Sequence, residues 1–307
     1  MATTETGQFL NQYVAPQLLE EFRNYKDDFM ARLSGAPARA ITADGIRYNK
    51  LINNVGFYVD NTEDFVAKKM TGEKTFVPWE KYDTDPTEVD DAEIRALAYD
   101  KRSAVRIKHA EAFKIGIRNH VLHKLAPDAH LEGKMPVLRT TGELVNGRKR
   151  LTFADLVAFR EAIRSLNLPL ENMYDLILCP DHSTDLLLDR DAAKDFATNL
   201  FLDPVSGKIK SFLGFNFFEN NQAVMYDSAG KKKAQGAVSA TGDMAASVFY
   251  YGPNTVYHLE QVKILYKPET IDTKSADPKS EFRTQTYGLV DRVVDYGFGA
   301  IISGAGA

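Results

Sequence analysis

The stretch from residue 38 to residue 92 is long, polar and only weakly periodic, and it restricts most strongly how this chain can fold. A connection of that length without secondary structure of its own is uncommon inside a compact domain. Disordered segments are poor in aromatic residues, yet this stretch contains Phe57, Phe65, Phe76, Trp79 and Tyr82. We therefore expect an extended arm or hairpin that buries its aromatic side chains against another subunit.

The charge of the chain changes sign at the end of this stretch. Residues 80–93 contain seven acids and one base, whereas residues 95–124 contain eight bases and two acids. One interpretation is local pairing across a turn between two solvated faces. The other is an acidic arm that reaches the basic helix of a neighbouring copy, with the opposite charges setting the register.

Apolar spacing predicts two helices in the first half of the chain. The first lies between Pro16 and Gly35 and would dock on its own domain or on a neighbouring chain. The second covers about 109–125 and ends before Pro127; the residues from 93 to its start alternate as in a strand. The apolar residues that define the two helices are Leu18, Phe22, Tyr25, Phe29 and Leu33, and then Phe113, Ile117 and Val121.

The second half of the chain mixes helices with short apolar strands. Thr152 and Asp155 have the spacing of an N-cap, and a helix with Leu156, Phe159, Ile163 and Leu166 on its buried face follows. The segment "YDLILCP" predicts a buried strand that stops at Pro180, before a helix capped by Asp181 or Ser183. Further strands follow to the end, with no repeat and no linker that divides domains. The chain therefore belongs to the α+β class.

Composition excludes several kinds of protein. The net charge of −4 does not indicate a nucleic-acid-binding protein, and no apolar run approaches the length of a membrane span. The first residues lack the pattern of a secretory signal, and a single cysteine, Cys179, suits a reducing compartment. We expect a protein that is made and folded in the cytoplasm.

No group of residues has the pattern of a catalytic, cofactor or metal site. Cys179, Asp181, His182 and Asp185 are neighbours at a strand end, where a buried cysteine and a helix-capping acid explain them. His109, His120 and His123 lack a carboxylate or cysteine that would complete a metal site, so we interpret them as surface or interface histidines. The three lysines at 231–233 predict a solvated turn. We expect no enzyme activity, no cofactor and no bound metal.

The order of the segments resembles the major capsid protein of tailed bacteriophages with the Hong Kong 97-type fold. The segments that carry the resemblance are "YVAPQLLEEFRNYKDDFMARL", the aromatic-containing stretch to 92, "EIRALAYDKRSAVRIKHAEAF", "LTFADLVAFREAIRSLNLP" with "YDLILCPDHSTDLLLD", and the final third from "LGFNFFENNQAVMYD". The resemblance covers essentially all 307 residues. It rests on architecture, since no single motif is diagnostic.

The resemblance implies a domain plan. It assigns an N-terminal arm with an amphipathic helix (1–50), an extended loop (51–92) and a peripheral domain with a long spine helix (93–150). An axial domain (151–252) and a return to the peripheral domain with C-terminal strands (253–307) follow.

The resemblance also implies a function and its partners. The chain would assemble into the icosahedral shell around the double-stranded DNA of a tailed phage, as pentamers and hexamers of itself. Other expected partners are a separate scaffolding protein, a portal and decoration proteins, with DNA bound without sequence specificity and no membrane. The shell would be assembled in the bacterial cytoplasm and would form the virion capsid.

We expect the contacts between subunits to use the aromatic and charged residues singled out above. They are Phe22, Phe29, Phe76, Trp79, Tyr82, Asp83, Asp85, Glu88, Lys101, Arg102 and Arg106. Three alternatives stay open: an encapsulin-like compartment around enzyme cargo, a homo-oligomeric enzyme with an unrecognised site, and a phage tail-tube or sheath subunit.

Overall fold

A computed structural model of the chain describes residues 28–51, 57, 59–62, 64, 66–67, 69, 72–90, 101–169, 172, 174–189, 201–202 and 209–305. The N-terminal helix predicted from Pro16 therefore lies outside the described residues up to residue 27, together with Phe22. The first part of the strand predicted before the spine helix, residues 93–100, also lies outside them.

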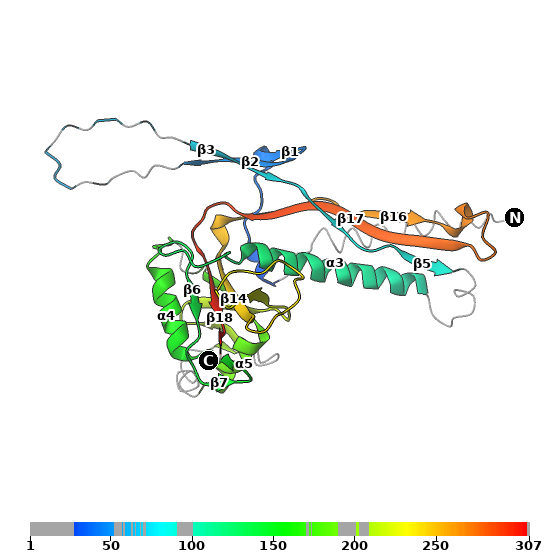
Figure 1. Ribbon diagram of the computed structural model, residues 1–307. Helices are drawn as coiled ribbons and strands as arrows, with labels where there is room; N and C mark the ends of the chain where they lie inside the picture. Colours follow the sequence, from blue (N-terminus) through cyan, green and yellow to red (C-terminus); the bar gives the residue numbers. More distant parts are fainter. Residues whose placement is uncertain are drawn as a thin grey trace.

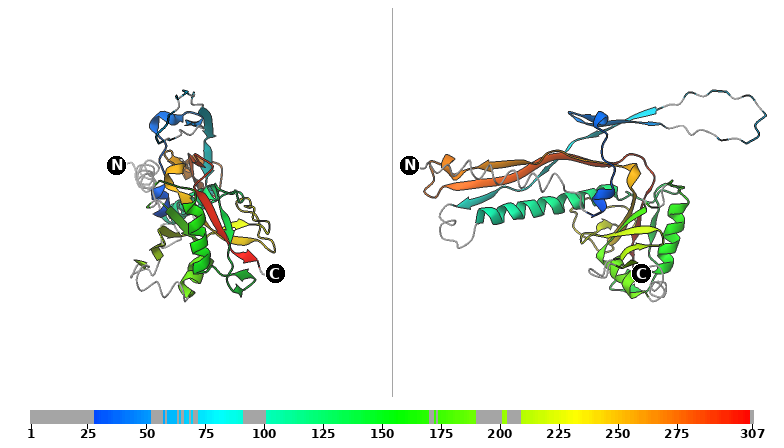
Figure 2. Two further views of the ribbon diagram at one scale, coloured as in Figure 1. Left: turned by 90° about the vertical axis from the view of Figure 1, so that its left-hand side faces the viewer. Right: turned by 180° about the vertical axis from the view of Figure 1, so that it is seen from behind.

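The chain forms an elongated lobe and a compact lobe, and a thin hairpin projects from their junction (Figure 1). Seen from behind, the hairpin and the free end of the elongated lobe point away from each other (Figure 2). The hairpin sheet has the order β1-β2-β3. Its strands are β1 (Ile41–Thr42), β2 (Gly45–Leu51) and β3 (Gly72–Pro78), and the short helices η1 (Asp28–Arg32) and η2 (Ala38–Ala40) precede them.

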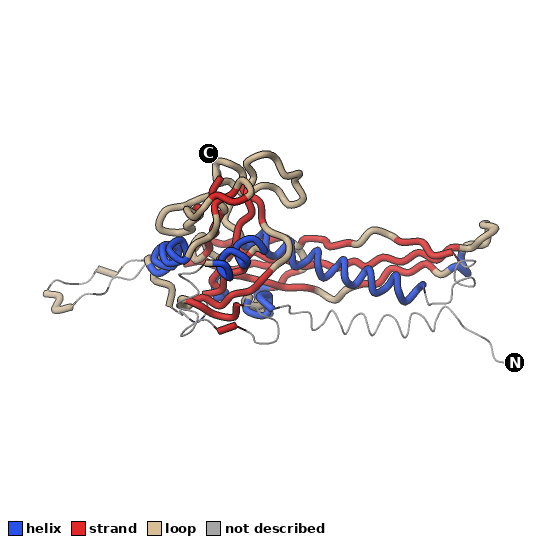
Figure 3. Tube along the Cα trace, turned by 90° about the horizontal axis from the view of Figure 1, so that it is seen from below, coloured by secondary structure: helices blue, strands red, loops and turns tan. Residues whose placement is uncertain are grey.

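The elongated lobe consists of one long helix along a narrow antiparallel sheet, as the view from below shows (Figure 3). The strand β17 is its centre, with β15 and β16 paired along one edge and β4 and β5 along the other. The elements are α3 (Lys101–Leu125), β4 (Glu80–Asp83), β5 (Thr87–Asp90), β15 (Thr255–Leu259), β16 (Lys263–Lys267) and β17 (Lys279–Arg292), with η4 (Gly252–Asn254) and η5 (Glu269–Ile271) between them.

The compact lobe is built on an eight-stranded mixed sheet in the order β10-β11-β12-β9-β14-β18-β6, with β13 paired to β14. The strands are β6 (Val137–Arg139), β9 (Tyr174–Leu178), β10 (Phe201–Leu202), β11 (Ile209–Phe212), β12 (Phe215–Glu219), β13 (Val224–Tyr226), β14 (Met244–Tyr251) and β18 (Phe298–Ile302). Among its described residues, the lobe also contains the helices α4 (Phe153–Arg164) and α5 (Pro180–Leu188) and a small sheet of β7 (Leu144–Val145), β8 (Arg148–Lys149) and β19 (Gly304–Ala305).

The central strand β9 is buried on both faces, as its unbroken apolar run predicts. Leu176 packs with α4 on one face, whereas Ile177 packs with the C-terminal end of α3 on the other. The capping box of Thr152 and Asp155 and the buried face of α4 are confirmed. The sheet of the compact lobe thus packs against helices of both lobes, with α4 on one face and α3 on the other.

Three local predictions are wrong. The helix α3 begins at Lys101, so residues 101–108 are not a strand. A short alternation of apolar and polar residues does not exclude a helix. The helix α5 begins at Pro180 after Cys179, with no side-chain cap. The lysines at 231–233 do not all lie in a solvated turn. The Lys232 side chain is largely buried and donates to the carbonyls of His123 and Ala126 at the end of α3.

Candidate assembly surface

The projecting hairpin is a two-stranded antiparallel ribbon that leaves the body of the molecule (Figure 1). Its pairing starts with Gly45 opposite Pro78. A Cβ atom on Gly45 would lie 2.2 Å from the carbonyl oxygen of Val77, so this close approach requires glycine. An isolated two-stranded hairpin has little stability in water, and the paired strands of this one lead away from both lobes (Figure 2).

Large apolar side chains of the projecting hairpin are exposed. Phe76 is 46% exposed, and the Arg47 guanidinium lies 5.0 Å from its ring centre. Phe57, Val59 and Val66, from the described residues between the strands, are 89%, 73% and 81% exposed. Single exposed apolar residues are normal, but these four lie on one projection, and none of them belongs to a buried cluster of the described residues. We interpret the group as a contact surface for another molecule.

The sequence prediction included Phe76 but missed Arg47, Val59 and Val66, and it named Phe57 only as an aromatic residue. For Phe57, Val59 and Val66 the available signal was their position in a polar segment, where no helical or strand period explains an apolar residue.

The root of the hairpin is held to its own chain by Trp79 and Tyr82. The indole Nε1 of Trp79 donates to the Thr42 carbonyl at 3.1 Å, and its ring lies 5.4 Å from that of His258. Tyr82 packs against the main core and donates its hydroxyl to Glu80. Both side chains therefore make contacts inside one subunit, so the structure favours an anchoring role for them over the predicted burial against a neighbour.

The acidic segment also finds its partners within the chain. The prediction placed residues 80–90 in an extended loop. In the structure they instead contain β4 and β5, which pair with β17. Glu80 contacts His120 and Lys124 of α3, each at 2.6 Å, and Glu88 pairs with Lys279 at 3.1 Å. The pairing of Glu80 with the basic helix therefore occurs inside one chain, but between segments 40 residues apart and not across a local turn.

The remaining predicted contact residues are two acids of the segment 83–85 and three bases at the start of α3. Asp83 pairs with Lys81 at 2.8 Å, and Asp85 is exposed, so both lie on the surface of the elongated lobe. Arg106 is half-buried on α3 near Ser103. The side chains of Lys101 and Arg102 are not among those described.

The structure contradicts the prediction that Phe29 contacts another subunit. Its side chain is fully buried, the Tyr250 hydroxyl donates to its carbonyl at 2.6 Å, and the Arg118 guanidinium lies over its ring. It belongs to the core of its own chain, so we withdraw it from the predicted contacts between subunits.

The cluster around Cys179 has no activated nucleophile. Burial raises the pKa of the Cys179 thiol to about 11 and lowers the pKa of His182 to about 4. The two ring nitrogens of His182 lie 2.8 Å and 2.9 Å from the hydroxyls of Ser247 and Ser303. His182 therefore links the middle of β14 to the residue that follows β18, and a neutral thiol beside it is a poor nucleophile.

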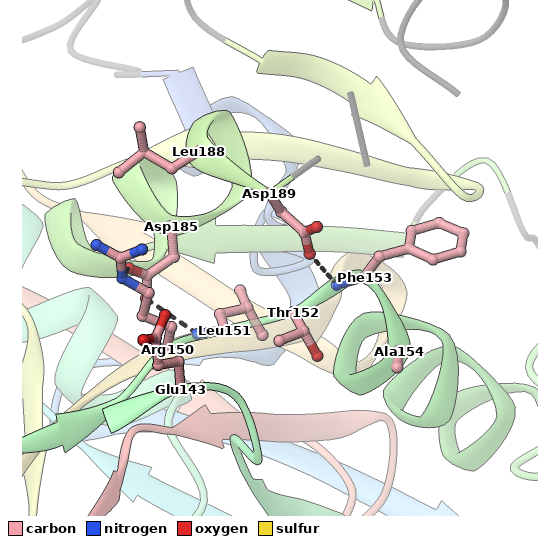
Figure 4. Close-up of a pocket in the computed structure, with 9 residues that line it drawn as sticks. All are labelled: Glu143, Arg150, Leu151, Thr152, Phe153, Ala154, Asp185, Leu188 and Asp189. Carbon is pink, nitrogen blue, oxygen red and sulfur yellow. Dashed lines mark hydrogen bonds and ion pairs between the residues drawn. The ribbon is translucent and has the colours of Figure 1, made fainter. Parts of the chain in front are cut away.

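A pocket of about 440 Å³ lies between residues 150–152, the start of α4 and the end of α5 (Figure 4). Its polar groups already serve the fold: Asp189 accepts from the backbone N–H of Phe153 at 2.7 Å, and Asp185 accepts from that of Leu151 at 3.0 Å. Arg150 points to the same Asp185 carboxylate. The Thr152 hydroxyl, which also lines the pocket, donates to Asp155 at 2.9 Å in the capping box of α4, so it too serves the fold.

Within the described ranges, no group of three or more histidine, cysteine, aspartate or glutamate side chains is placed to hold a metal ion. His109, His120 and His123 each contact residues of β4, β5 or the loop before β14 instead. In the same part of the chain, no helix combines the length and the hydropathy that a bilayer span requires.

No protein-family model matches the sequence, and no curated protein matches it. The fold, in contrast, is similar to many solved structures. The capsid of the cyanophage P-SCSP1u aligns with a TM-score of 0.62 at 12% identity and covers 86% of this chain and 85% of that chain. The mature capsid of bacteriophage PhiM1 gives 0.58 at 12% identity, with 91% and 87% covered.

A third similar structure is the capsid of Helicobacter pylori bacteriophage KHP30, with a TM-score of 0.58 at 12% identity and 91% and 92% of the two chains covered. Similarity at this level of identity shows a shared fold. The chain therefore has the mixed helix and sheet fold found in phage capsids, over nearly its whole length.

Proposed function

We propose that this chain is the major capsid protein of a tailed bacteriophage, with the Hong Kong 97-type fold. The observation that carries the proposal is the length of the match: about nine-tenths of this chain aligns with about nine-tenths of the KHP30 capsid chain. A shared fold alone does not fix a function. The projecting hairpin with its exposed apolar side chains supports assembly as the specific function.

The structure suggests how the proposed domain plan maps onto the elements. The elongated lobe would be the peripheral domain with α3 as its spine helix, and the compact lobe would be the axial domain. The projecting hairpin, from Gly45 to Pro78, would be the extended loop. The arm would comprise the residues that lead to it.

In the proposed mechanism, the hairpin of one subunit lies over the adjacent subunit and buries Phe57, Val59, Val66 and Phe76. Burial of apolar area gives about 25 cal/mol per Å², and each subunit would both offer a hairpin and accept one. Such head-to-tail contacts generate closed rings of five and six subunits when the rotation closes. Many modest contacts then sum to a stable shell.

We propose the remaining partners on the same basis. The shell would enclose double-stranded DNA through non-specific contacts and would carry a portal. A separate scaffolding protein would guide assembly, and decoration proteins could bind outside. The protein would thus be located in the virion capsid after assembly in the host cytoplasm, with no enzymatic role.

The test is size-exclusion chromatography with light scattering on the full chain, alone and with its scaffolding protein, followed by electron microscopy of any heavy fraction. We expect closed particles of megadalton mass. Filaments would favour a tail subunit, and closed particles that retain an enzyme would favour a cargo compartment. A dimer or tetramer that stays small under both conditions would contradict the proposal.

A further inference from the structure

Three segments that are distant in sequence meet at the root of the projecting hairpin. Glu80 begins β4, one residue after Trp79, and its carboxylate contacts Nε2 of His120 and Nζ of Lys124, both at 2.6 Å. The other ring nitrogen of His120, Nδ1, lies 2.9 Å from Oε1 of Gln235. Gln235 belongs to the loop between β13 and β14, so this cluster joins the hairpin root, α3 and that loop.

The partners of His120 determine how many protons the ring needs. A carboxylate oxygen and an amide oxygen are both acceptors, and they face both nitrogens of the ring. Only the imidazolium form has an N–H on each nitrogen, so only that form donates to both. When the ring is neutral, one contact is lost unless the exposed Gln235 amide turns over.

The loop that carries Gln235 is itself fixed to α3. Lys232 caps the end of the helix by donating to the carbonyls of His123 and Ala126 at 3.1 Å and 2.9 Å. His123 contacts the carbonyl of Lys233 through Nε2 at 2.8 Å. Gln235 is therefore presented to His120 by a fixed segment, and the contact is not an incidental one between two free side chains.

We propose that Glu80, His120 and Gln235 form a proton-operated clamp that positions the hairpin root on α3. With His120 charged, the clamp holds Glu80 and therefore the strand that follows the hairpin. With His120 neutral, the ring has one N–H for its two acceptors, and Glu80 keeps only Lys124 as a charged partner. The clamp rests on the proposed function for its purpose, which is to regulate how the hairpin is presented to a neighbouring subunit.

The charged groups around His120 are consistent with this assignment. From β4, Glu80 faces the ring, and the Tyr82 ring packs edge-on at 5.5 Å. From α3, Lys124 and His123 lie on the same side as the ring, and both oppose a positive charge on it. The loop contributes the neutral Gln235. The contacts with Glu80 and Gln235 together outweigh the opposing charges.

Burial lowers the pKa of His120, but the hydrogen bonds to Glu80 and Gln235 outweigh it, so the net pKa lies above its usual value of 6.5. The stabilisation from His120 is therefore complete below pH 6.5 and is lost as the pH rises through the higher folded-state pKa. For Glu80, burial raises the pKa, but His120 and Lys124 lower it to about 2. Its contribution is complete above pH 4.5 and is lost as the pH falls towards 2. The clamp is thus closed in mildly acidic solution and opens on the alkaline side.

The experiment uses the full chain with ¹³C-labelled histidine. The ring resonance of His120, identified among six histidines by its loss in His120→Gln, is titrated by NMR. Hydrogen exchange then gives protection factors for residues 72–83 at pH 6 and pH 8.5. We expect the His120 pKa above 6.5 and a loss of protection at the higher pH, because the charged ring that Glu80 contacts is then neutral. In His120→Gln the protection should not change with pH.

Two further variants make the test specific. Gln235→Glu places a second carboxylate at Nδ1 and should raise the His120 pKa and extend protection to higher pH. His130→Gln, at an exposed histidine of the compact lobe, should behave as the wild-type protein does. A His120 pKa at or below 6.5, or the same pH dependence of protection in His120→Gln as in wild type, would overturn the clamp.

These readouts do not depend on shell formation, so failure of the clamp and failure of the proposed function are distinguishable. If the chain forms no shells, the pKa and the protection factors still decide whether the clamp exists. If shells form and their yield follows the same pH range only when His120 is present, the regulatory role is supported. If the yield has no such dependence, that role is refuted.

Discussion

The compact lobe buries its large apolar side chains, whereas the projecting hairpin leaves several of its own exposed. In the compact lobe, Phe249 is fully buried, with the rings of Phe159, Tyr174 and Phe215 about 6 Å away. In the hairpin, Phe57 is 89% exposed. The same residue type thus contributes to the fold in one region and contributes almost nothing to it in the other.

This difference indicates where selection for function and selection for stability act. A residue that is buried in its own subunit owes its identity to packing. An apolar residue that the chain leaves exposed on a thin projection is, on the proposed function, a contact for a neighbouring subunit. Substitutions in the two regions should therefore separate folding from assembly.

Phe249→Ala should have the largest effect on folding. It removes a buried ring among three aromatic neighbours and should lower the free energy of unfolding by about 3–5 kcal/mol, measured by urea denaturation. The matched control, Phe57→Ala, should change that free energy by less than about 0.5 kcal/mol but reduce the yield of closed particles in light scattering. Equal losses of stability in both variants would contradict the separation.

Arg32→Ala tests the junction between the regions. The Arg32 guanidinium donates to the buried carboxylate of Asp175 at 3.0 Å, and Asp175 Oδ2 has no hydrogen-bond partner among the described residues. Removing the arginine leaves a buried charge without its counter-ion, which typically costs about 3 kcal/mol or more. Burial already raises the pKa of Asp175 against the effect of Asn216 and Arg32. The loss in urea denaturation should therefore be larger at pH 8 than at pH 5, where the carboxyl group can take up a proton.

The control for this prediction is a double variant. Adding Asp175→Asn to Arg32→Ala removes the unpaired charge and should recover much of the lost stability at pH 8. A double variant that is as unstable as the single one would show that Arg32 acts through packing.

Gly45→Ala should affect the hairpin and leave the compact lobe unchanged. The added Cβ would lie 2.2 Å from the Val77 carbonyl oxygen, so the base of the β2–β3 pairing must move. Such overpacking costs about 1–3 kcal/mol, here confined to the hairpin. Hydrogen exchange of residues 72–78 should accelerate while the urea midpoint of the compact lobe stays the same. Gly35→Ala, where a Cβ meets nothing within 4 Å, is the control, and faster exchange there too would count against a local clash.

Sequence patterns predicted the compact lobe well, because its elements are specified locally. The capping box at Thr152 sets the start of α4, and the apolar run from Tyr174 to Leu178 forms the central strand. Fold class, in turn, followed from the order of segments. The structure confirms it at the level of a mixed helix and sheet fold similar to phage capsids.

The candidate site was harder to predict because it depends on long-range pairing. Glu80 and Glu88 looked like part of an acidic arm, but their partners are His120, Lys124 and Lys279, which no local pattern can identify. The burial of Phe29 depends on Tyr250, more than two hundred residues away. Charge counts give the sign of a segment, and only the tertiary structure decides which charges meet.

The smallest expected effect comes from Trp79→Phe at the root of the hairpin. The phenyl ring keeps the contact with His258 but cannot donate to the Thr42 carbonyl, and a neutral hydrogen bond contributes about 1 kcal/mol. Exchange of the amides in residues 72–78 should rise by about fivefold, a factor that corresponds to that energy, with little change in urea denaturation. Trp79→Ala removes the ring contact as well and should raise exchange further. If both variants exchange at the wild-type rate, Trp79 does not anchor the hairpin, and its half-buried ring is then better explained by the contact with a neighbouring subunit that the sequence first suggested.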